Sequence, residues 1–141
     1  MTIEQLYAIY RQNPSIQTDT RKLKPGDTFF ALKGPNFNGN AFAQQAMEAG
    51  AAFAIVDEEV DSDNPRIVQV KDGLRALQEL ALFHRRQFDI PVIAITGSNG
   101  KTTTKELVHA VLSSTYKTYT TQGNLNNHIS VALTHVSIDS D

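Results

Sequence analysis

The stretch PVIAITGSNGKTTTKELVHAVL, residues 91–112, holds an apolar run, a turn with two glycines and a helical pattern, in that order. A strand that leads through such a turn into a helix aims the unpaired N–H groups of the first helical turn at one point. Phosphate oxygens bind well there, because these groups donate to them and the helix dipole favours negative charge. We therefore predict a strand at 92–96 and a phosphate-binding loop. A helix follows from about Lys101 to Ser114, and its apolar residues Leu107, Val108, Val111 and Leu112 are expected to face inward.

The loop carries the residue types that nucleotide binding needs. Glycines at 97 and 100 let the backbone turn tightly and approach an anion. Lys101 supplies a positive charge for the β and γ phosphates, which makes it the candidate catalytic residue, and the Thr102 hydroxyl can ligate Mg²⁺. The pattern is GxxGKT, shorter than GxxxxGK[ST], because Ile95 stands where the longer pattern has glycine.

Two parts of the loop allow two interpretations. Asn99 suits a turn as well as a ligand contact, and Thr103 and Thr104 either touch the α phosphate or fill the first helical turn. An ordinary turn is the alternative for GSNGK as a whole, but the flanking strand and helix favour a nucleotide loop. The predicted loop comprises Gly97, Ser98, Asn99, Gly100, Lys101, Thr102 and Thr103.

In residues 2–87, segments with the apolar spacing of a helix take turns along the chain with segments typical of a strand. Thr2 and Gln5 have the spacing of a capping box, Gly50 fits a helix C-terminus, and Asp72 fits a helix N-cap. The expected elements are a helix at 2–11, a strand at 28–32, a helix that ends at Gly50, strands at 52–56 and 66–70, and a helix from Asp72 to about Gln87.

A domain boundary is expected near residue 89, because Pro91 disfavours helix at Ile90 and a new strand begins beyond it. The second part continues with a strand at 117–121 and a helix from about Asn126 to Val136. We predict an α/β fold in which a small N-terminal α/β domain, residues 1–89, precedes the first part of a P-loop ATPase domain, residues 90–141.

Composition excludes several classes of function. Hydrophobic residues make up 40% of the 141 and charged residues 20%, and the net charge of -2 does not favour a nucleic-acid partner. Without cysteine there are no disulfides or thiolate metal sites, and the four histidines lack metalloprotease spacing. The N-terminus has no basic start before an apolar core, and no run approaches the roughly 20 apolar residues of a membrane span. We expect a cytoplasmic protein with no membrane partner.

The sequence resembles the ATP-dependent Mur ligases of peptidoglycan synthesis. Their hallmark TGxNGKT[ST] stands at residues 96–104 as TGSNGKTTT, and TDTRKLKPGDTFFALKG at 18–34 is similar to their N-terminal pattern. The dipeptide KE at 105–106 and GNLNN at 123–127 are most similar to the members that join D-alanyl-D-alanine to UDP-N-acetylmuramoyl tripeptide. The sequence departs from the pattern at Thr20, where serine is usual, at Asn38, where aspartate is common, and at Ser130 and Ala132, where glycine and proline are frequent.

The resemblance implies a ligase reaction with ATP and Mg²⁺ as cofactors. ATP phosphorylates the terminal carboxylate of the tripeptide, and the amine of D-alanyl-D-alanine attacks the acyl phosphate to form an amide. It also implies substrate contacts, although Thr20, Arg21, Lys33, Gly34 and Asn36 fit surface turns equally well, and the asparagines fit helix caps. The implied substrate-binding residues are Thr20, Arg21, Lys33, Gly34, Asn36, Asn126 and Asn127.

In the family, an acidic magnesium ligand, a carbamylated lysine, a histidine and a C-terminal domain come later than the motifs found here. The resemblance therefore implies a fragment that is inactive alone, and it leads us to expect low stability or self-association in residues 90–141. Two alternatives stay open: a related Mur or folylpolyglutamate-type ligase, and a nucleotide-binding stub without catalysis.

Overall fold

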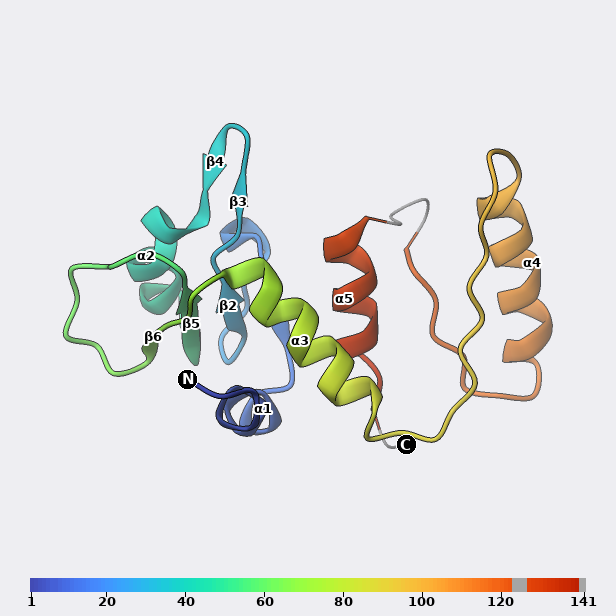
Figure 1. The fold of residues 1–141 in the computed structure, drawn as a ribbon, viewed down its shortest axis with the longest axis horizontal. Coiled ribbons are helices and arrows are strands. Elements are labelled where there is room, and N and C mark those ends of the chain that lie inside the picture. Colours follow the sequence, from blue (N-terminus) through green and yellow to red (C-terminus); the bar gives the residue numbers. More distant parts are fainter. Residues whose placement is uncertain (123–126, 140–141) are drawn as a thin grey trace.

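A four-stranded parallel sheet forms the centre of the N-terminal part. The structure is a computed structural model that describes residues 1–122 and 127–139. The strands run in the order β1-β2-β5-β6, so each strand pairs with the next one along the chain within this sheet (Figure 1). Their bounds are β1 Ile16–Gln17, β2 Thr28–Phe30, β5 Phe53–Val56 and β6 Ile67–Gln69.

Helices cover both faces of this sheet. Helix α1, Ile3–Gln12, and helix α3, Gly73–Arg85, pack with Phe30 and Ile55 in one core cluster. Helix α2, Ala43–Glu48, packs with Phe29, Ala54 and Val56 in the other cluster. Neighbouring strand residues point to opposite faces, which explains why Phe29 and Phe30 lie in different clusters. Both residues are fully buried, as expected for a parallel strand with helices on both sides.

Local capping signals predict the ends of these helices correctly. The Thr2 side chain accepts from the Gln5 N–H, and the Gln5 side chain accepts from the Thr2 N–H, which completes the predicted capping box. Asp72 caps α3 by accepting from the Arg75 N–H at 2.9 Å. Gly50 has a φ of 98°, the left-handed conformation expected after a helix. The predicted helix starts and the strands at 28–32, 52–56 and 66–70 are confirmed within a few residues.

Short elements at one end of the sheet were not predicted. Strand β3, Lys33–Gly34, pairs with β4, Phe37–Asn38, in a small antiparallel hairpin that follows β2. The 3-10 helix η1, Thr20–Lys22, follows β1, and the 3-10 helix η2, Gly39–Phe42, leads from the hairpin into α2. Elements of two to four residues carry too little periodicity to be detected from sequence.

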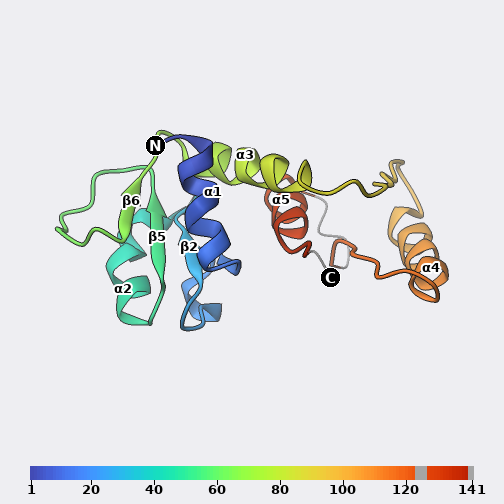
Figure 2. The same cartoon turned by 90° about the horizontal axis from the view of Figure 1, so that it is seen from below.

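Two further helices follow the N-terminal part. Helix α4, Lys101–Ser113, lies at the far end of the molecule from α2, whereas α5, His128–Val136, lies along α3 (Figures 1 and 2). Ala132 and Val136 of α5 are buried in the same cluster as Leu77 and Leu80 of α3. Helix α5 therefore extends the core of the N-terminal part, although it lies in residues 90–141.

Two predicted strands are absent from the structure. Residues 92–96 and 117–121 have no regular secondary structure and pair with no strand in the described part of the chain. A parallel strand needs a neighbour for its hydrogen bonds, and apolar composition alone does not supply one. The inward face predicted for α4 is wrong for Leu107 and Val111, which are 64% and 71% exposed, whereas Val108 and Leu112 are partly buried. The division near residue 89 and the expected self-association stay predictions.

Candidate functional site

The glycine loop has the backbone geometry that an anion site requires. Gly97 and Gly100 have φ values of 143° and 74°, which L side chains rarely adopt. Gly100 is the N-cap of α4 and offers no side chain to its first turn. The first N–H groups of α4 are therefore left for an external acceptor, and the helix dipole adds positive potential there.

Space and charge around the loop also fit a phosphate. A Cβ atom built at Gly100 would meet no heavy atom within 4 Å, so the backbone is open to an approaching ligand. The Lys101 side chain is exposed and takes part in none of the ion pairs found among the described residues. The Thr102 side chain is partly buried, and Ser98, Asn99 and Thr103 are exposed. The donors predicted for an ATP phosphate chain are all present at one helix start.

In the same helix, the Lys105 side chain contacts another segment of the chain. Its side chain is only 13% exposed, and its Nζ donates to the Thr121 carbonyl oxygen at 2.8 Å. This contact ties the first turns of α4 to the segment at 117–121. Lys105 therefore holds α4 against that segment, whereas the Lys101 side chain is exposed.

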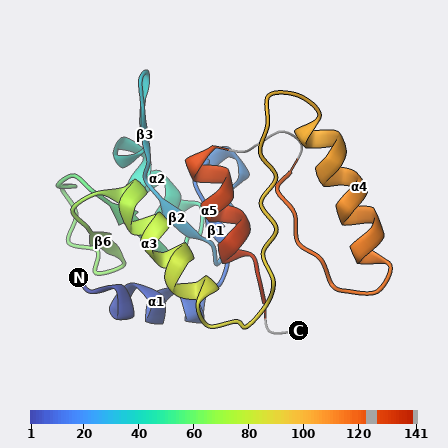
Figure 3. The same ribbon diagram turned by 45° about the vertical axis from the view of Figure 1, so that its right-hand side comes forward.

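Five of the other predicted site residues follow the carboxyl ends of two parallel strands. Thr20 and Arg21 come after β1, Lys33 and Gly34 come after β2, and Asn36 lies in the turn of the hairpin. In parallel α/β sheets, ligands bind outside this edge. The hairpin, the start of α5 and the start of α4 all lie at the upper end of the molecule in Figures 1 and 3, with α5 between the sheet and the glycine loop.

Arg21 is held by a carboxylate at this edge. Its Nε and Nη2 donate to the two oxygens of Asp19 at 2.9 Å and 2.8 Å, and its backbone N–H also donates to Asp19. Hydrogen bonds from the Arg21 side chain and then from its backbone lower the pKa of Asp19 to about 2. The Arg21 side chain is 86% exposed, so it can still reach a ligand.

Lys33 is paired with two carboxylates. Its Nζ lies 3.0 Å from Asp57 Oδ1 and 2.8 Å from Glu58 Oε1. Hydrogen bonds from Lys33 and then from Asn38 lower the pKa of Glu58. Burial alone would raise the pKa of Asp57, but hydrogen bonds from the Gly73 N–H, Asn40 and Lys33 outweigh burial and lower it.

Asp57 joins the segments that build this edge. Its Oδ2 accepts from the Gly73 N–H at the start of α3, and its Oδ1 accepts from the Asn40 side chain in η2. The Asn40 amide oxygen in turn accepts from the Asp57 N–H at 2.9 Å. No motif in the sequence points to Asp57, Glu58 or Asn40. The two carboxylates directly follow the strand predicted at 52–56, and that position was the available signal.

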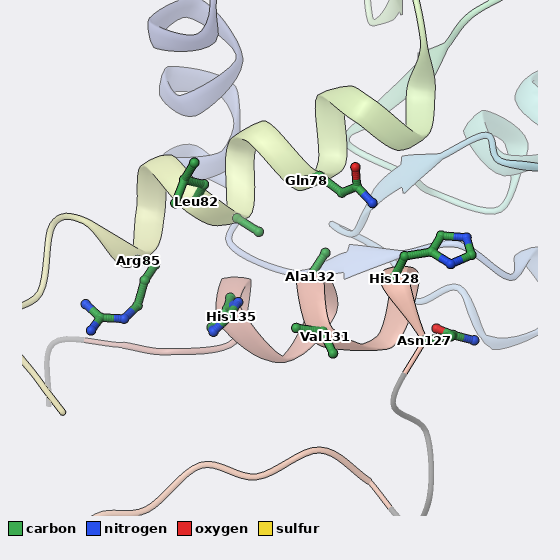
Figure 4. A pocket seen from close by; sticks show the side chains of 9 residues that line it. Gln78, Leu82, Arg85, Asn127, His128, Val131, Ala132 and His135 are labelled. Carbon is green, nitrogen blue, oxygen red and sulfur yellow. The ribbon is translucent and has the colours of Figure 1, made fainter. Parts of the chain in front are cut away.

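A groove between α3 and α5 borders one predicted substrate residue. Its volume is about 380 Å³, and Leu82, Val131 and Ala132 form part of its apolar wall (Figure 4). Asn127 lies at one end and caps α5, because its side chain accepts from the Ile129 and Ser130 N–H groups. The capping role is thus confirmed for Asn127, while a substrate contact stays a prediction. Asn126 lies outside the described residues.

The opposite end of this groove carries two basic side chains. Arg85 and His135 lie there, across α3 and α5 (Figure 4). Burial and then the nearby Arg85 charge lower the pKa of His135. The Arg85 guanidinium donates to the carbonyl oxygens of Phe88 and Ile90 at 2.8 Å and 2.6 Å, so it holds the chain that leaves α3. At this end of the groove, the Arg85 side chain therefore binds the backbone of the segment that follows α3.

The described residues supply only part of a magnesium site. Among residues 1–122 and 127–139, no three His, Cys, Asp or Glu side chains are grouped to hold a metal. Thr102 can supply one oxygen ligand, which is typical of a magnesium ion that is also held by substrate phosphates. Within the same residues, no helix has the length and apolar character that a membrane crossing needs.

Comparison with known proteins identifies the family. A family model described as the Mur ligase family, catalytic domain, matches residues 14–85, about half of the chain. The chain belongs to the Mur ligase family. A second model, the Mur ligase middle domain, matches residues 95–140, which include the glycine loop. The glycine loop and the carboxyl edge of the sheet thus lie in two separately matched segments of one Mur ligase chain.

Individual relatives agree with this family. The UDP-N-acetylmuramoyl-tripeptide--D-alanyl-D-alanine ligase of Bacillus subtilis is 46% identical over 121 residues, which cover 84% of this Mur ligase chain and 26% of the relative. The ligase of the same name from Escherichia coli is 47% identical over 120 residues, 85% of this chain and 26% of the relative. The chain therefore spans about a quarter of the length of these relatives.

Solved structures show the same fold. A MurF crystal structure from Acinetobacter baumannii matches with a TM-score of 0.85 and 35% identity over 98% of this chain and 33% of that chain. MurF ligase from Thermotoga maritima, solved in complex with ADP, matches with a TM-score of 0.80 and 30% identity over 89% of this chain and 29% of that chain. The mixed α/β architecture with a parallel sheet is thus the architecture of MurF structures.

Proposed function

We propose that this chain is the nucleotide- and substrate-binding part of an ATP-dependent ligase that joins D-alanyl-D-alanine to UDP-N-acetylmuramoyl tripeptide in the cytoplasm. The glycine loop carries the proposal: an uncapped helix start, two glycines with positive φ and a Lys101 that forms no ion pair in the described part of the chain meet at one place. The names of the relatives supply the substrates.

In this proposal, the residues of the loop bind and orient the phosphates. The N–H groups at the start of α4 and the Lys101 ammonium would hold the β and γ phosphates of ATP, and Thr102 would ligate Mg²⁺. ATP supplies a phosphoryl group that turns a carboxylate, a poor electrophile, into one with a good leaving group. Lys101 then stabilises negative charge on the transferring group.

The sugar nucleotide would bind at the carboxyl edge of the sheet, near Thr20, Arg21, Lys33, Gly34 and Asn36. The position of these residues after β1 and β2 supports this assignment. Asn127, the N-cap of α5, would contribute to this site, as would Asn126, which precedes it in the sequence. The chain then brings a site for each of two ligands, on separate elements.

The proposal is tested by calorimetric titration of the chain with Mg-ATP and, separately, with UDP-N-acetylmuramoyl tripeptide. We expect Lys101→Ala to weaken Mg-ATP binding about 10- to 100-fold, because one charge-assisted contact to phosphate is lost. The same substitution should leave binding of the sugar nucleotide unchanged. Lys71→Ala, which removes an exposed lysine from the N-terminal part, is the matched control.

Two results would contradict the proposal. Equal Mg-ATP affinity in the wild type and in Lys101→Ala would mean that the nucleotide binds elsewhere. A folded chain that binds neither ligand at millimolar concentration would mean that the segment shares the fold of Mur ligases without their binding sites.

A further inference from the structure

Lys33 forms ion pairs that connect the ends of two neighbouring strands. It follows β2, whereas Asp57 and Glu58 follow the neighbouring strand β5. Both carboxylates lie within 3.0 Å of its Nζ. One lysine and two carboxylates leave a net charge of -1 at this point of the edge. The two carboxylates therefore already neutralise the positive charge that a sugar diphosphate would meet at Lys33.

The two carboxylates are held very differently. The Asp57 side chain is 11% exposed and also accepts from the Gly73 N–H and the Asn40 side chain. Moving it away from Lys33 would break contacts between three segments and leave a buried charge without its cation, which is costly. Asp57 is therefore a fixed partner of Lys33.

Glu58 is the partner that can leave. Its side chain is 44% exposed, and apart from Lys33 it accepts only from Asn38 Nδ2, at 2.8 Å, in the described part of the chain. Water can replace both contacts when the side chain rotates outward, because an exposed ion pair contributes little free energy. The Lys33 side chain is itself 44% exposed, so a ligand phosphate can reach its ammonium from solvent.

We propose that Glu58 competes with a phosphate group of the sugar nucleotide for the Lys33 ammonium, and so lowers the affinity of this edge for its substrate. The inference rests on the proposed function, because it takes the sugar nucleotide as the ligand of this edge. In the unliganded protein Glu58 occupies the place of the phosphate. When the ligand binds, Lys33 keeps Asp57 and exchanges Glu58 for a phosphate oxygen.

The test compares neighbouring carboxylates. Glu58→Gln removes the competing charge, whereas Glu59→Gln removes the same charge from an exposed residue that forms no ion pair in the described part of the chain. Calorimetry with UDP-N-acetylmuramoyl tripeptide at 0.15 M salt limits effects beyond about 8 Å. We expect the Kd to fall about two- to five-fold in Glu58→Gln, the range of an exposed ion pair, and to change less in Glu59→Gln.

A double variant links the effect to Lys33. In a Lys33→Met background, Glu58→Gln should no longer change the Kd, because the contested cation is gone. Circular dichroism and the midpoint of urea unfolding check that each variant is folded.

The outcomes separate the inference from the proposed function. Equal changes in Glu58→Gln and Glu59→Gln, or the same gain in the Lys33→Met background, would overturn the competition but keep the substrate site. Weaker binding in Glu58→Gln would overturn the competition too, and would mean that Glu58 stabilises the hairpin through its contact with Asn38. No binding by the wild type or any variant would overturn both the substrate site and the competition.

Discussion

Among single residues, Gly39 is the one whose lack of a side chain the fold requires most directly. A Cβ atom at this position would lie 2.8 Å from both the backbone nitrogen and oxygen of Leu32 and 2.9 Å from the Cα of Ala31. These are backbone atoms of the chain that leaves β2, and the Gly39 N–H donates to the Leu32 oxygen at 2.8 Å. The hairpin can close over the strand end only because nothing projects from residue 39.

We therefore expect Gly39→Ala to lower the free energy of unfolding by about 1–3 kcal/mol, the usual cost of overpacking. Gly34 lies in the same hairpin, and a Cβ there would meet no heavy atom within 4 Å. Gly34→Ala should change stability by less than about 0.5 kcal/mol. Urea unfolding of both variants measures the difference in their free energies of unfolding. Equal values would show that the backbone at Ala31 and Leu32 shifts at little cost to accept a methyl group.

At the scale of elements, the docking of α5 on α3 decides how far the core extends. Ala132 is 5% exposed and faces the α3 cluster, whereas its neighbour Val131 is 37% exposed. A carboxylate at 132 would have to enter an apolar contact, and burying a charge without a partner is costly. A carboxylate at 131 can remain in water.

Ala132→Asp should consequently detach α5, with hydrogen exchange in residues 128–136 at least about tenfold faster, because local opening then costs over 1.4 kcal/mol less. Val131→Asp is the control and should leave this exchange nearly unchanged. Protection in α1 and in the sheet should persist in both variants. Slow exchange of α5 in Ala132→Asp would mean that the helix is held mainly by its ends.

Elements also differ in how well the sequence specifies them. The capping box at Thr2 and the cap at Asp72 are local signals, and both helices start where these residues predict. The strand expected at 92–96 depends on a partner strand, which no local pattern can provide. In the candidate site, the glycine loop was predictable because its residues are consecutive. The pairing of Lys33 with Asp57 and Glu58 was not, because it arises only when β2 and β5 align.

For the whole molecule, one buried cluster joins the first helix to the last described residues. The Tyr10 hydroxyl of α1 donates to the Val136 oxygen at 2.5 Å, and His84 Nε2 of α3 lies 2.6 Å from the Ile138 oxygen. A carbonyl oxygen only accepts, so Nε2 carries a proton, and in the neutral imidazole Nδ1 then accepts from the Tyr7 hydroxyl at 3.1 Å. This cluster connects residues 126 positions apart in the sequence.

The cluster predicts how stability responds to alkaline pH. Burial, then Tyr7 and Asp139, raises the pKa of Tyr10 from 10.0 to about 12. Between these values the unfolded chain has lost the phenolic proton while the folded chain keeps it. Unfolding then releases a proton, so stability is complete below pH 10 and falls as pH rises through the folded pKa. The loss attributable to Tyr10 should reach about 2–3 kcal/mol near pH 12.

Tyr10→Phe isolates this contribution. At pH 7 the variant should be less stable by about 1–3 kcal/mol, because the buried Val136 oxygen loses its donor. Between pH 10 and 12, however, its stability should fall less steeply than that of the wild type. Lys33 and Lys117, whose carboxylate partners raise their pKa values, add the same alkaline loss to both proteins. Tyr116→Phe, at a tyrosine that is 65% exposed, is the control. If the urea midpoints of Tyr10→Phe and of the wild type fall equally between pH 10 and 12, ionisation of Tyr10 does not contribute to the alkaline loss of stability.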